Sequence, residues 1–169
     1  MLQSGDTVPN FSQQSSQGKI DFYDWAGDSW IVFFSYPTDY TSVCTELSNV
    51  AKLKPEFNKR GVKVIALSVD RKEYQQDLIN NINETQDVTV NYPIVTDIDR
   101  SVSNLYGITN SNADAKAIVR TVFVIDPQKK LCLTISDPPD MGSDFGETIT
   151  ERNFQDVLRT IDSLQSTDN

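Results

Sequence analysis

Cys44 is the side chain in this 169-residue sequence best suited to nucleophilic chemistry. It follows an apolar run at residues 30–34, which predicts a buried strand, and precedes a segment that we predict to be helical from about Val43. The first turn of a helix leaves backbone N–H groups unpaired and carries the positive end of the helix dipole, so it stabilises an anion. A thiol placed there tends toward the thiolate, which is its nucleophilic form. The alternative is a small buried residue, and position alone leaves both interpretations open.

Arg120 is the cation best placed to stabilise such a thiolate. It stands inside the apolar run at 118–125, which predicts a strand. A charge buried there is costly unless an anion or hydrogen-bond acceptors meet it, and the alternative is an edge position with the guanidinium in solvent. Together with Cys44, Arg120 favours an anion site built from thiolate and guanidinium. Thr41 lies three residues before Cys44, where its hydroxyl can cap the helix and also contact the molecule that the sulfur attacks.

The composition excludes several classes of function. Fifteen Lys and Arg residues against twenty-four Asp and Glu give a net charge of -9, which argues against nucleic acid and anionic membranes as partners. The sequence has no His, which excludes Ser-His-Asp and Cys-His catalysis, and two cysteines alone cannot complete a zinc site. We therefore expect neither a metal nor a cofactor. The first residues lack a signal-peptide pattern and no apolar run is long enough to span a bilayer, so we expect a cytoplasmic protein.

Strands and helices alternate along the chain, which predicts one α/β domain over residues 1–169 with a mixed central β-sheet flanked by helices. An N-terminal hairpin is expected around Gly18. The main strands are predicted at 30–36, 62–69, 92–96, 118–125 and 131–135, and the last helix is predicted to carry Phe154 to Leu164.

Two further predictions concern helices. We expect Pro55 to break or kink the helix that carries Cys44, and Gly61 to stop the segment after Pro55. The helix after the second strand is predicted to turn one apolar face to the sheet, formed by Tyr74, Leu78, Ile79 and Ile82.

The pattern Pro37-x-x-x-Thr41-x-x-Cys44, with Arg120 opening a distant strand, resembles the active-site signature of the peroxiredoxins. The similarity covers nearly the whole chain and is closest to the one-cysteine peroxiredoxins of the peroxiredoxin-six type. It implies a thioredoxin fold and the reduction of hydrogen peroxide and organic hydroperoxides through a cysteine sulfenic acid. It also implies that Cys44 is the nucleophile, Arg120 lowers its pKa and binds a peroxide oxygen, Thr41 orients the peroxide and Pro37 shields the pocket. Arg152 matches a second family arginine near the pocket, and its alternative is a solvated residue at a helix start.

The sequence also departs from that family. One residue instead of two separates Cys44 from Glu46, which turns the carboxylate by about 100° on a helix, so Glu46 is not given the family role of bracing the arginine. Tyr36 stands where the peroxiredoxin-six type has His. Ser29 matches a serine linked to phospholipase activity in some relatives, but no His exists to activate it, and we reject that activity. The family's C-terminal extension is missing, so we expect a more open pocket, and we interpret the long loop at 137–146 as surface decoration.

Cys132 does not match a family resolving position. Its alternation with apolar neighbours in 131–135 places it on an exposed or interface face. We therefore expect an external thiol, glutathione or a thioredoxin-like protein, to reduce the sulfenic acid of a homodimeric enzyme. Two alternatives stay open: a redox sensor or oxidation-triggered chaperone that uses the same Cys44, and an enzyme that forms a Cys44 to Cys132 disulfide.

Overall fold

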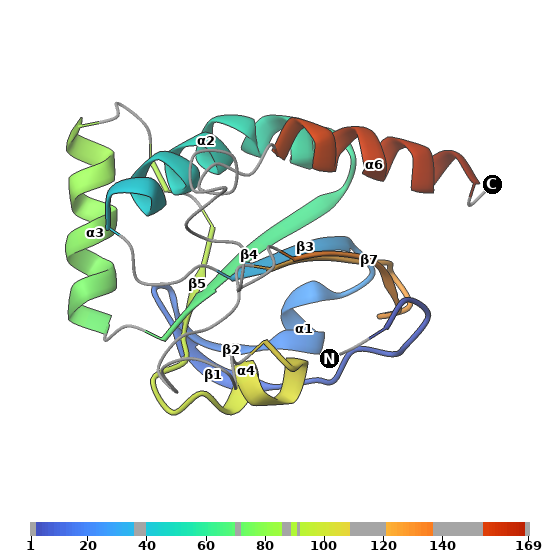
Figure 1. Cartoon of the computed structure of the whole chain (residues 1–169), viewed down its shortest axis with the longest axis horizontal. Helices are drawn as coiled ribbons and strands as arrows, with labels where there is room; N and C mark the ends of the chain where they lie inside the picture. The colour runs from blue at the N-terminus through green and yellow to red at the C-terminus, as the bar shows by residue number, and fades with distance from the viewer. Residues whose placement is uncertain are drawn as a thin grey trace, which may run out of the picture.

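The fold is seen in a computed structural model of the chain (Figure 1). The structure describes residues 3–35, 40–69, 72–85, 89–90, 92–108, 121–136 and 154–167. It describes the side chains of these residues except at 40–46, 72, 135–136, 154–156 and 166–167.

A seven-stranded mixed sheet forms the centre of the described part, in the order β2-β1-β5-β4-β3-β6-β7. The three inner strands β5, β4 and β3 run parallel, and every other neighbouring pair is antiparallel. The predicted mixed sheet and N-terminal hairpin are therefore confirmed. The strand bounds are β1 (Ser12–Ser15), β2 (Gly18–Asp21), β3 (Trp30–Ser35), β4 (Val62–Ser68), β5 (Ile94–Thr96), β6 (Thr121–Ile125) and β7 (Leu131–Ser136).

Helices cover both faces of this sheet. In Figure 1, α2 and α6 lie side by side above the sheet with α3 at its left end, while α1 and α4 lie below. Among the helices that the structure describes, none has the length and apolar character needed to cross a membrane. The helix bounds are α1 (Phe22–Ala26), α2 (Tyr40–Lys59), α3 (Lys72–Thr85), α4 (Ser101–Tyr106) and α6 (Phe154–Thr167).

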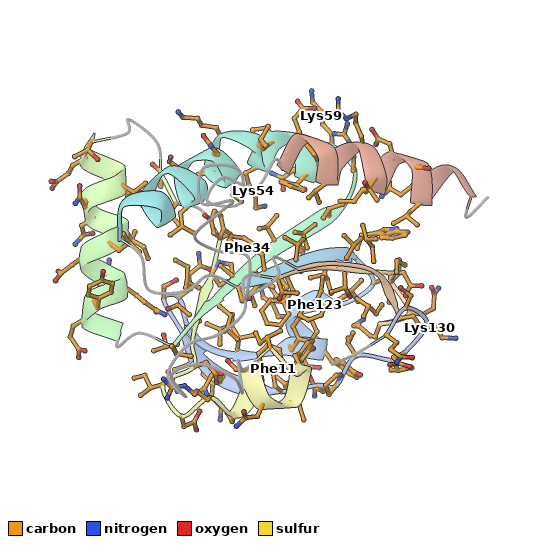
Figure 2. The ribbon with its side chains drawn as sticks, viewed as in Figure 1. Phe11, Phe34, Lys54, Lys59, Phe123 and Lys130 are labelled. Atoms are coloured by element: carbon orange, nitrogen blue, oxygen red, sulfur yellow. The ribbon has the colours of Figure 1, made fainter. Side chains whose placement is uncertain are left out.

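The central strand β3 separates two hydrophobic cores. Val32 and Phe34 point into the core shared with α2, α3 and α6, whereas Ile31 and Phe33 point into the core shared with α1 and α4. Figure 2 shows Phe34 above the sheet and Phe123 below it. Because strand residues alternate between faces, a strand buried on both sides needs an uninterrupted apolar run, as the sequence has here.

Aromatic rings fill the lower core. Phe11 stacks on Phe22 with centroids 4.8 Å apart, and Tyr106 meets Phe33 edge-on at 5.2 Å. The Tyr106 hydroxyl donates a hydrogen bond to the Pro9 carbonyl at 2.7 Å, and burial raises the pKa of this hydroxyl. A buried tyrosine needs such an acceptor, so Tyr106 joins α4 to the N-terminal segment.

The face that α3 turns to the sheet differs from the prediction by one residue. Leu78, Ile79 and Ile82 are buried as predicted, but Tyr74 is 37% exposed and Gln75 is fully buried in its place. Positions 75, 78, 79 and 82 follow the i, i+3, i+4, i+7 spacing of one helix face. The polar character of Gln75 hid this position, and its hydrogen bonds are described with the site below.

Pro55 lies inside α2 and does not end it, so of the predicted break or kink the break is wrong. A proline removes one backbone donor from the helix, at a cost that packing can offset. Ala51 and Phe57, on either side of Pro55, are both buried in the upper core and hold the helix against the sheet. The helix ends instead at Lys59, before Gly61 with a φ of 68°, which agrees with the predicted glycine stop.

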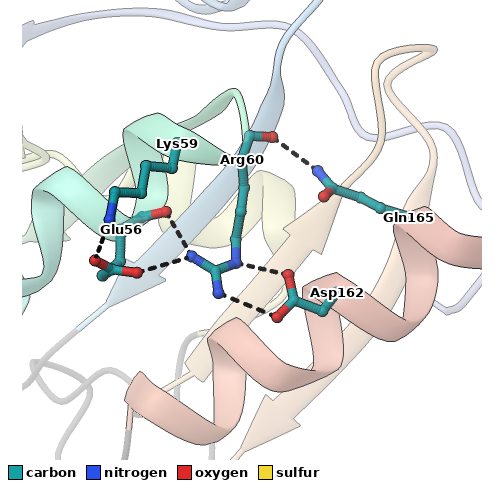
Figure 3. Close-up of polar contacts among 5 residues, drawn as sticks. All are labelled: Glu56, Lys59, Arg60, Asp162 and Gln165. Atoms are coloured by element: carbon teal, nitrogen blue, oxygen red, sulfur yellow. Dashed lines mark hydrogen bonds and ion pairs between the residues drawn. The ribbon is translucent and has the colours of Figure 1, made fainter.

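Arg60 fastens the end of α2 to α6 (Figure 3). Its guanidinium donates to both carboxylate oxygens of Asp162, at 2.6 and 3.1 Å, and to the carbonyl and carboxylate of Glu56. The Arg60 carbonyl accepts a hydrogen bond from Gln165 at 2.8 Å, and Lys59 pairs with Glu56 at 3.1 Å. The bidentate contact with Asp162 joins residues that are far apart in the sequence, so it fixes α6 on α2.

We expect the variant Asp162→Asn to unfold at a lower temperature than the wild type at pH 7. Hydrogen bonds from Arg60, and then its positive charge, hold the pKa of the Asp162 carboxyl below its usual range. A carboxyl with a lowered folded-state pKa stabilises the fold fully above its unfolded pKa of about 4, and this stabilisation is lost as the pH falls through the folded-state value. The difference in unfolding temperature between Asp162→Asn and the wild type should therefore become smaller below about pH 4.

Thermal unfolding followed by circular dichroism between pH 7 and pH 3 measures this difference. The control is Asp77→Asn, which changes an exposed carboxylate on α3. If Asp162→Asn lowers the unfolding temperature by the same amount at every pH, or if Asp77→Asn lowers it equally, the stabilising role assigned to the Asp162 carboxylate is contradicted.

Candidate active site

Cys44 lies on α2, the helix that follows β3, so the predicted strand-to-helix context is confirmed. The helix begins at Tyr40, three residues before the predicted start, and Cys44 is its fifth residue. In an α-helix the N–H of the fifth residue already has the carbonyl of the first as its acceptor, and the dipole effect falls off within the first turn. The predicted first-turn position is therefore wrong. At this position the dipole of the helix start favours the Cys44 thiolate less than it would in the first turn.

Thr41 is the second residue of α2. The capping residue of a helix precedes its first helical residue, so the prediction that Thr41 caps α2 is wrong. The side chains of Thr41 and Cys44 are outside the described set, and so is that of Glu46. Pro37, Arg120 and Arg152 also lie outside the described residues, as do Tyr36 and the loop at 137–146.

The sheet brings the segments that carry Cys44 and Arg120 to the same edge. β3 and β6 are antiparallel neighbours, with Phe34 opposite Val122. One residue further, the Thr121 N–H donates a hydrogen bond to the Ser35 hydroxyl at 3.1 Å. β3 thus ends where β6 begins. In the sequence, Ser35 is followed by the segment that leads to Cys44, and Thr121 is directly preceded by Arg120.

A buried polar network lies at the ends of the two neighbouring strands on the same edge. The Gln75 amide of α3 donates to the Ser68 hydroxyl of β4 at 2.5 Å and accepts from the Thr96 hydroxyl of β5 at 2.8 Å. It also donates to the Val95 carbonyl at 3.2 Å. Buried polar groups whose partners are all satisfied rigidify a core. Gln75 therefore fixes the ends of β4 and β5 beside the end of β3.

Tyr92 holds the part of α2 that follows Cys44. Its hydroxyl donates to the Leu47 carbonyl at 2.8 Å, and its side chain is only 1% exposed. Leu47 lies less than one helical turn beyond Cys44. This contact crosses from the segment before β5 to α2, so it limits how far the helix can shift over the sheet.

We expect Tyr92→Phe to lower the free energy of unfolding by about 1–2 kcal/mol, because it removes a buried hydrogen bond. Amide exchange at residues 43–50 of α2 should become faster. Tyr106→Phe is the matched control, since it removes the hydrogen bond to the Pro9 carbonyl in the opposite core. Hydrogen–deuterium exchange with peptide mass readout measures both variants. If Tyr106→Phe speeds exchange in α2 equally, the tether assigned to Tyr92 is wrong.

Cys132 lies at an irregular point of β7. Val124 pairs with Leu133 and Ile125 with Leu131, so the register shift skips Cys132. Leu131 packs into the lower core and Leu133 against the upper one, although residues two apart in a regular strand share a face. The strand is therefore not as regular as the prediction assumed, and Cys132 is half-buried, which leaves the predicted exposed or interface face open. Its sulfur lies 3.9 Å from the Lys130 carbonyl, beside the far end of β6 from Thr121.

Within the described ranges, no group of three or more His, Cys, Asp or Glu side chains is placed to hold a metal ion. The sequence interpretation missed Ser35, Thr121, Gln75 and Tyr92, which hold the elements around the site. The helical spacing of Gln75 was a usable signal. The other contacts join residues at least 45 positions apart, and no local pattern marks them.

The sheet order and the helices on its two faces define a thioredoxin-like α/β fold, as predicted. Residues 4–133 match the AhpC/TSA family. The 1-Cys peroxiredoxin of Dictyostelium discoideum is 48% identical over 168 residues, which cover 99% of this chain and 66% of that protein. Peroxiredoxin-6 of Mus musculus is 40% identical over 172 residues, covering 96% of this chain and 73% of that protein.

A solved structure of the yeast mitochondrial 1-Cys peroxiredoxin superposes with a TM-score of 0.87 at 44% identity, over 99% of this chain and 78% of that one. That structure was described as the basis of a thiol resolving mechanism via glutathione/thioredoxin systems. The chain belongs to the AhpC/TSA family, and these relatives within it are peroxiredoxins, which confirms the resemblance found in the sequence. This chain spans just under two thirds of the length of the Dictyostelium relative.

Proposed function

We propose that this protein is a thiol-dependent peroxidase that reduces hydrogen peroxide and organic hydroperoxides through a one-cysteine mechanism. The observation that carries the proposal is the sheet edge at Ser35 and Thr121, where the segments bearing Cys44 and Arg120 meet the sheet side by side. A thiol and a guanidinium brought to one edge form the pair that stabilises a thiolate for attack on an electrophilic oxygen.

In the first step, the Cys44 thiolate attacks one peroxide oxygen. The S–O bond forms as the O–O bond breaks, the sulfur loses two electrons, and the departing hydroxide or alkoxide takes up a proton to become water or an alcohol. Arg120 lowers the pKa of the thiol and binds an oxygen of the peroxide, so it stabilises the charge that develops on the leaving oxygen. The product on the enzyme is the Cys44 sulfenic acid.

Three further residues complete the proposed site. Thr41 orients the peroxide, and its position one helical turn before Cys44 puts both residues on one side of α2. Pro37 shields the pocket from water, and Arg152 adds a second positive charge near it. These roles rest on the match of the four-residue signature and of Arg152 to the family pattern.

An external thiol returns Cys44 to its starting state. The first thiol attacks the sulfenic sulfur, releases water and forms a mixed disulfide, and a second thiol then releases Cys44 and leaves as a disulfide. Within one chain a bond to Cys132 is disfavoured, because the proposed mechanism requires Cys44 beside Arg120, and Cys132 lies about four residues, or ~13 Å, along β6 from Thr121, the neighbour of Arg120. A disulfide needs Cα atoms within about 7 Å of each other. Glutathione or a thioredoxin-like protein is therefore the proposed reductant, in line with the glutathione/thioredoxin systems described for the yeast mitochondrial relative.

Catalytic turnover tests this function. With hydrogen peroxide in tenfold excess over protein, an enzyme consumes all of it when glutathione with glutaredoxin, or thioredoxin with its reductase, is supplied. A redox sensor or oxidation-triggered chaperone consumes about one equivalent and stops in every reductant. A stop after one equivalent in each system would overturn the peroxidase and favour the sensor.

The proposal also includes a homodimer located in the cytoplasm. Two cysteines in a chain of this size suit a reducing compartment, and the family resemblance supports the dimer. Light scattering of the purified protein should give twice the monomer mass of 19.0 kDa, and fractionation of cells should place the protein in the cytosol.

A further inference from the structure

We propose that Ser35 is a positioning residue, whose hydroxyl holds the Arg120 side of the site in register with the Cys44 side. The inference deepens the proposed function and rests on it. Ser35 does not belong to the signature of Pro37, Thr41, Cys44 and Arg120. Its role follows from its hydrogen bond and its place at the last position of β3.

The contact between Ser35 and Thr121 is sheltered from water. The two residues are 2% and 0% exposed, and the N···O distance is 3.1 Å. Within the described residues, the backbone pairing of β3 with β6 reaches Phe34 and Val122. The Ser35 hydroxyl adds a further hydrogen bond between the two strands through a side chain, next to the segments that lead to Cys44 and Arg120 in the sequence.

This hydrogen bond joins the strand that leads to Cys44 and the strand that follows Arg120. Arg120 is covalently joined to Thr121, and consecutive Cα atoms are only about 3.8 Å apart. On the other strand, Ser35 is the last strand residue before the connection to α2. Loss of this hydrogen bond would let the start of β6 move relative to the end of β3. Small errors in the placement of a catalytic group can cost up to ~100-fold in rate.

Ser15 offers a matched control on a more distant strand. It is also a serine at the end of its strand, is 0% exposed, and its hydroxyl also accepts a hydrogen bond from a backbone N–H, that of Gln17 at 3.1 Å. Replacing either serine with alanine removes one buried acceptor at similar cost in stability. Only Ser35→Ala acts on the strand that pairs directly with the one following Arg120.

The test uses the Cys132→Ala protein as parent, in which Cys44 is the single thiol. The rate of Cys44 alkylation by iodoacetamide is measured from pH 4 to pH 10 and gives the midpoint at which the thiolate forms. We expect Ser35→Ala to raise this midpoint by about one pH unit, which corresponds to about tenfold less thiolate at pH values below both midpoints. Ser15→Ala should keep the midpoint of the parent while losing similar thermal stability.

Ser35→Thr retains the hydroxyl and should retain the parent midpoint. This result would show that the hydroxyl acceptor, and not serine as such, is required. Ser35→Thr also provides a second comparison if Ser35→Ala folds poorly. Equal midpoints for Ser35→Ala and Ser15→Ala, or a raised midpoint in Ser35→Thr as large as that in Ser35→Ala, would overturn the inference. Peroxide consumption by the parent is recorded separately. Its absence would refute the peroxidase, whereas the alkylation midpoints would still decide the role of Ser35.

Discussion

Cys44→Ser is expected to lower thiol-dependent peroxide consumption by at least ~10³-fold, to the rate of the reductant alone. A serine hydroxyl stays protonated at neutral pH, and its oxygen cannot become a sulfenic acid, so both the attack and the intermediate are lost. The substitution replaces one sulfur atom by oxygen on a helix whose later residues pack firmly on the sheet, so the fold should be kept. The measurement is the initial rate of peroxide loss in the glutathione and thioredoxin systems.

Cys132→Ser is the matched control for this variant. Cys132 lies at the far end of β6 from the edge at Thr121 and should contribute nothing to turnover, so the variant should keep the wild-type rate. Loss of activity in Cys132→Ser with thioredoxin would instead favour the two-cysteine mechanism. Wild-type activity in Cys44→Ser would remove Cys44 from the mechanism altogether.

Arg120→Gln should slow the reaction of Cys44 with peroxide by about 10²-fold, the usual cost of losing one donor that stabilises transition-state charge. The guanidinium favours the charged form of a neighbouring thiol, so its removal raises the pKa of Cys44. The pH profile of thiolate formation should therefore shift to higher pH, with the largest loss of rate on its acid side. Stopped-flow measurement of single-turnover oxidation between pH 5 and pH 9 gives both quantities.

Two other arginine variants sharpen this result. Arg120→Lys keeps the charge but not the planar set of donors, so it should recover part of the pH shift and little of the rate. Arg152→Gln removes a positive charge of the same kind from the second family position and should slow the reaction only a few-fold. An Arg152→Gln effect larger than that of Arg120→Gln would reverse the two assignments.

The sequence predicted most of the fold because the strands carry strong local signals. The uninterrupted apolar runs of β3 and β4 predict strands buried on both faces, and the structure confirms both. The prediction was wrong where tertiary contacts oppose a local preference. Pro55 usually ends a helix, yet α2 continues to Lys59 because buried residues on both sides of the proline hold it against the sheet.

The site was only partly predictable for the same reason. Cys44 stands out through its residue type and its strand-to-helix context, both of which are local. Its support comes from Tyr92, Gln75, and the Ser35 contact with Thr121, which depend on strand order and register. The alternation from which the face of Cys132 was predicted is broken by a register shift in β7, which no local pattern in the sequence marks.

The most direct test of the central claim is the location of the first oxygen atom after limited oxidation. The reduced protein is treated with half an equivalent of hydrogen peroxide, trapped with dimedone, and analysed by intact mass and peptide mapping. We predict that the modification falls on Cys44 alone and that Arg120→Gln slows its appearance. First oxidation at Cys132 or at a methionine, with Cys44 still reduced, would contradict the account.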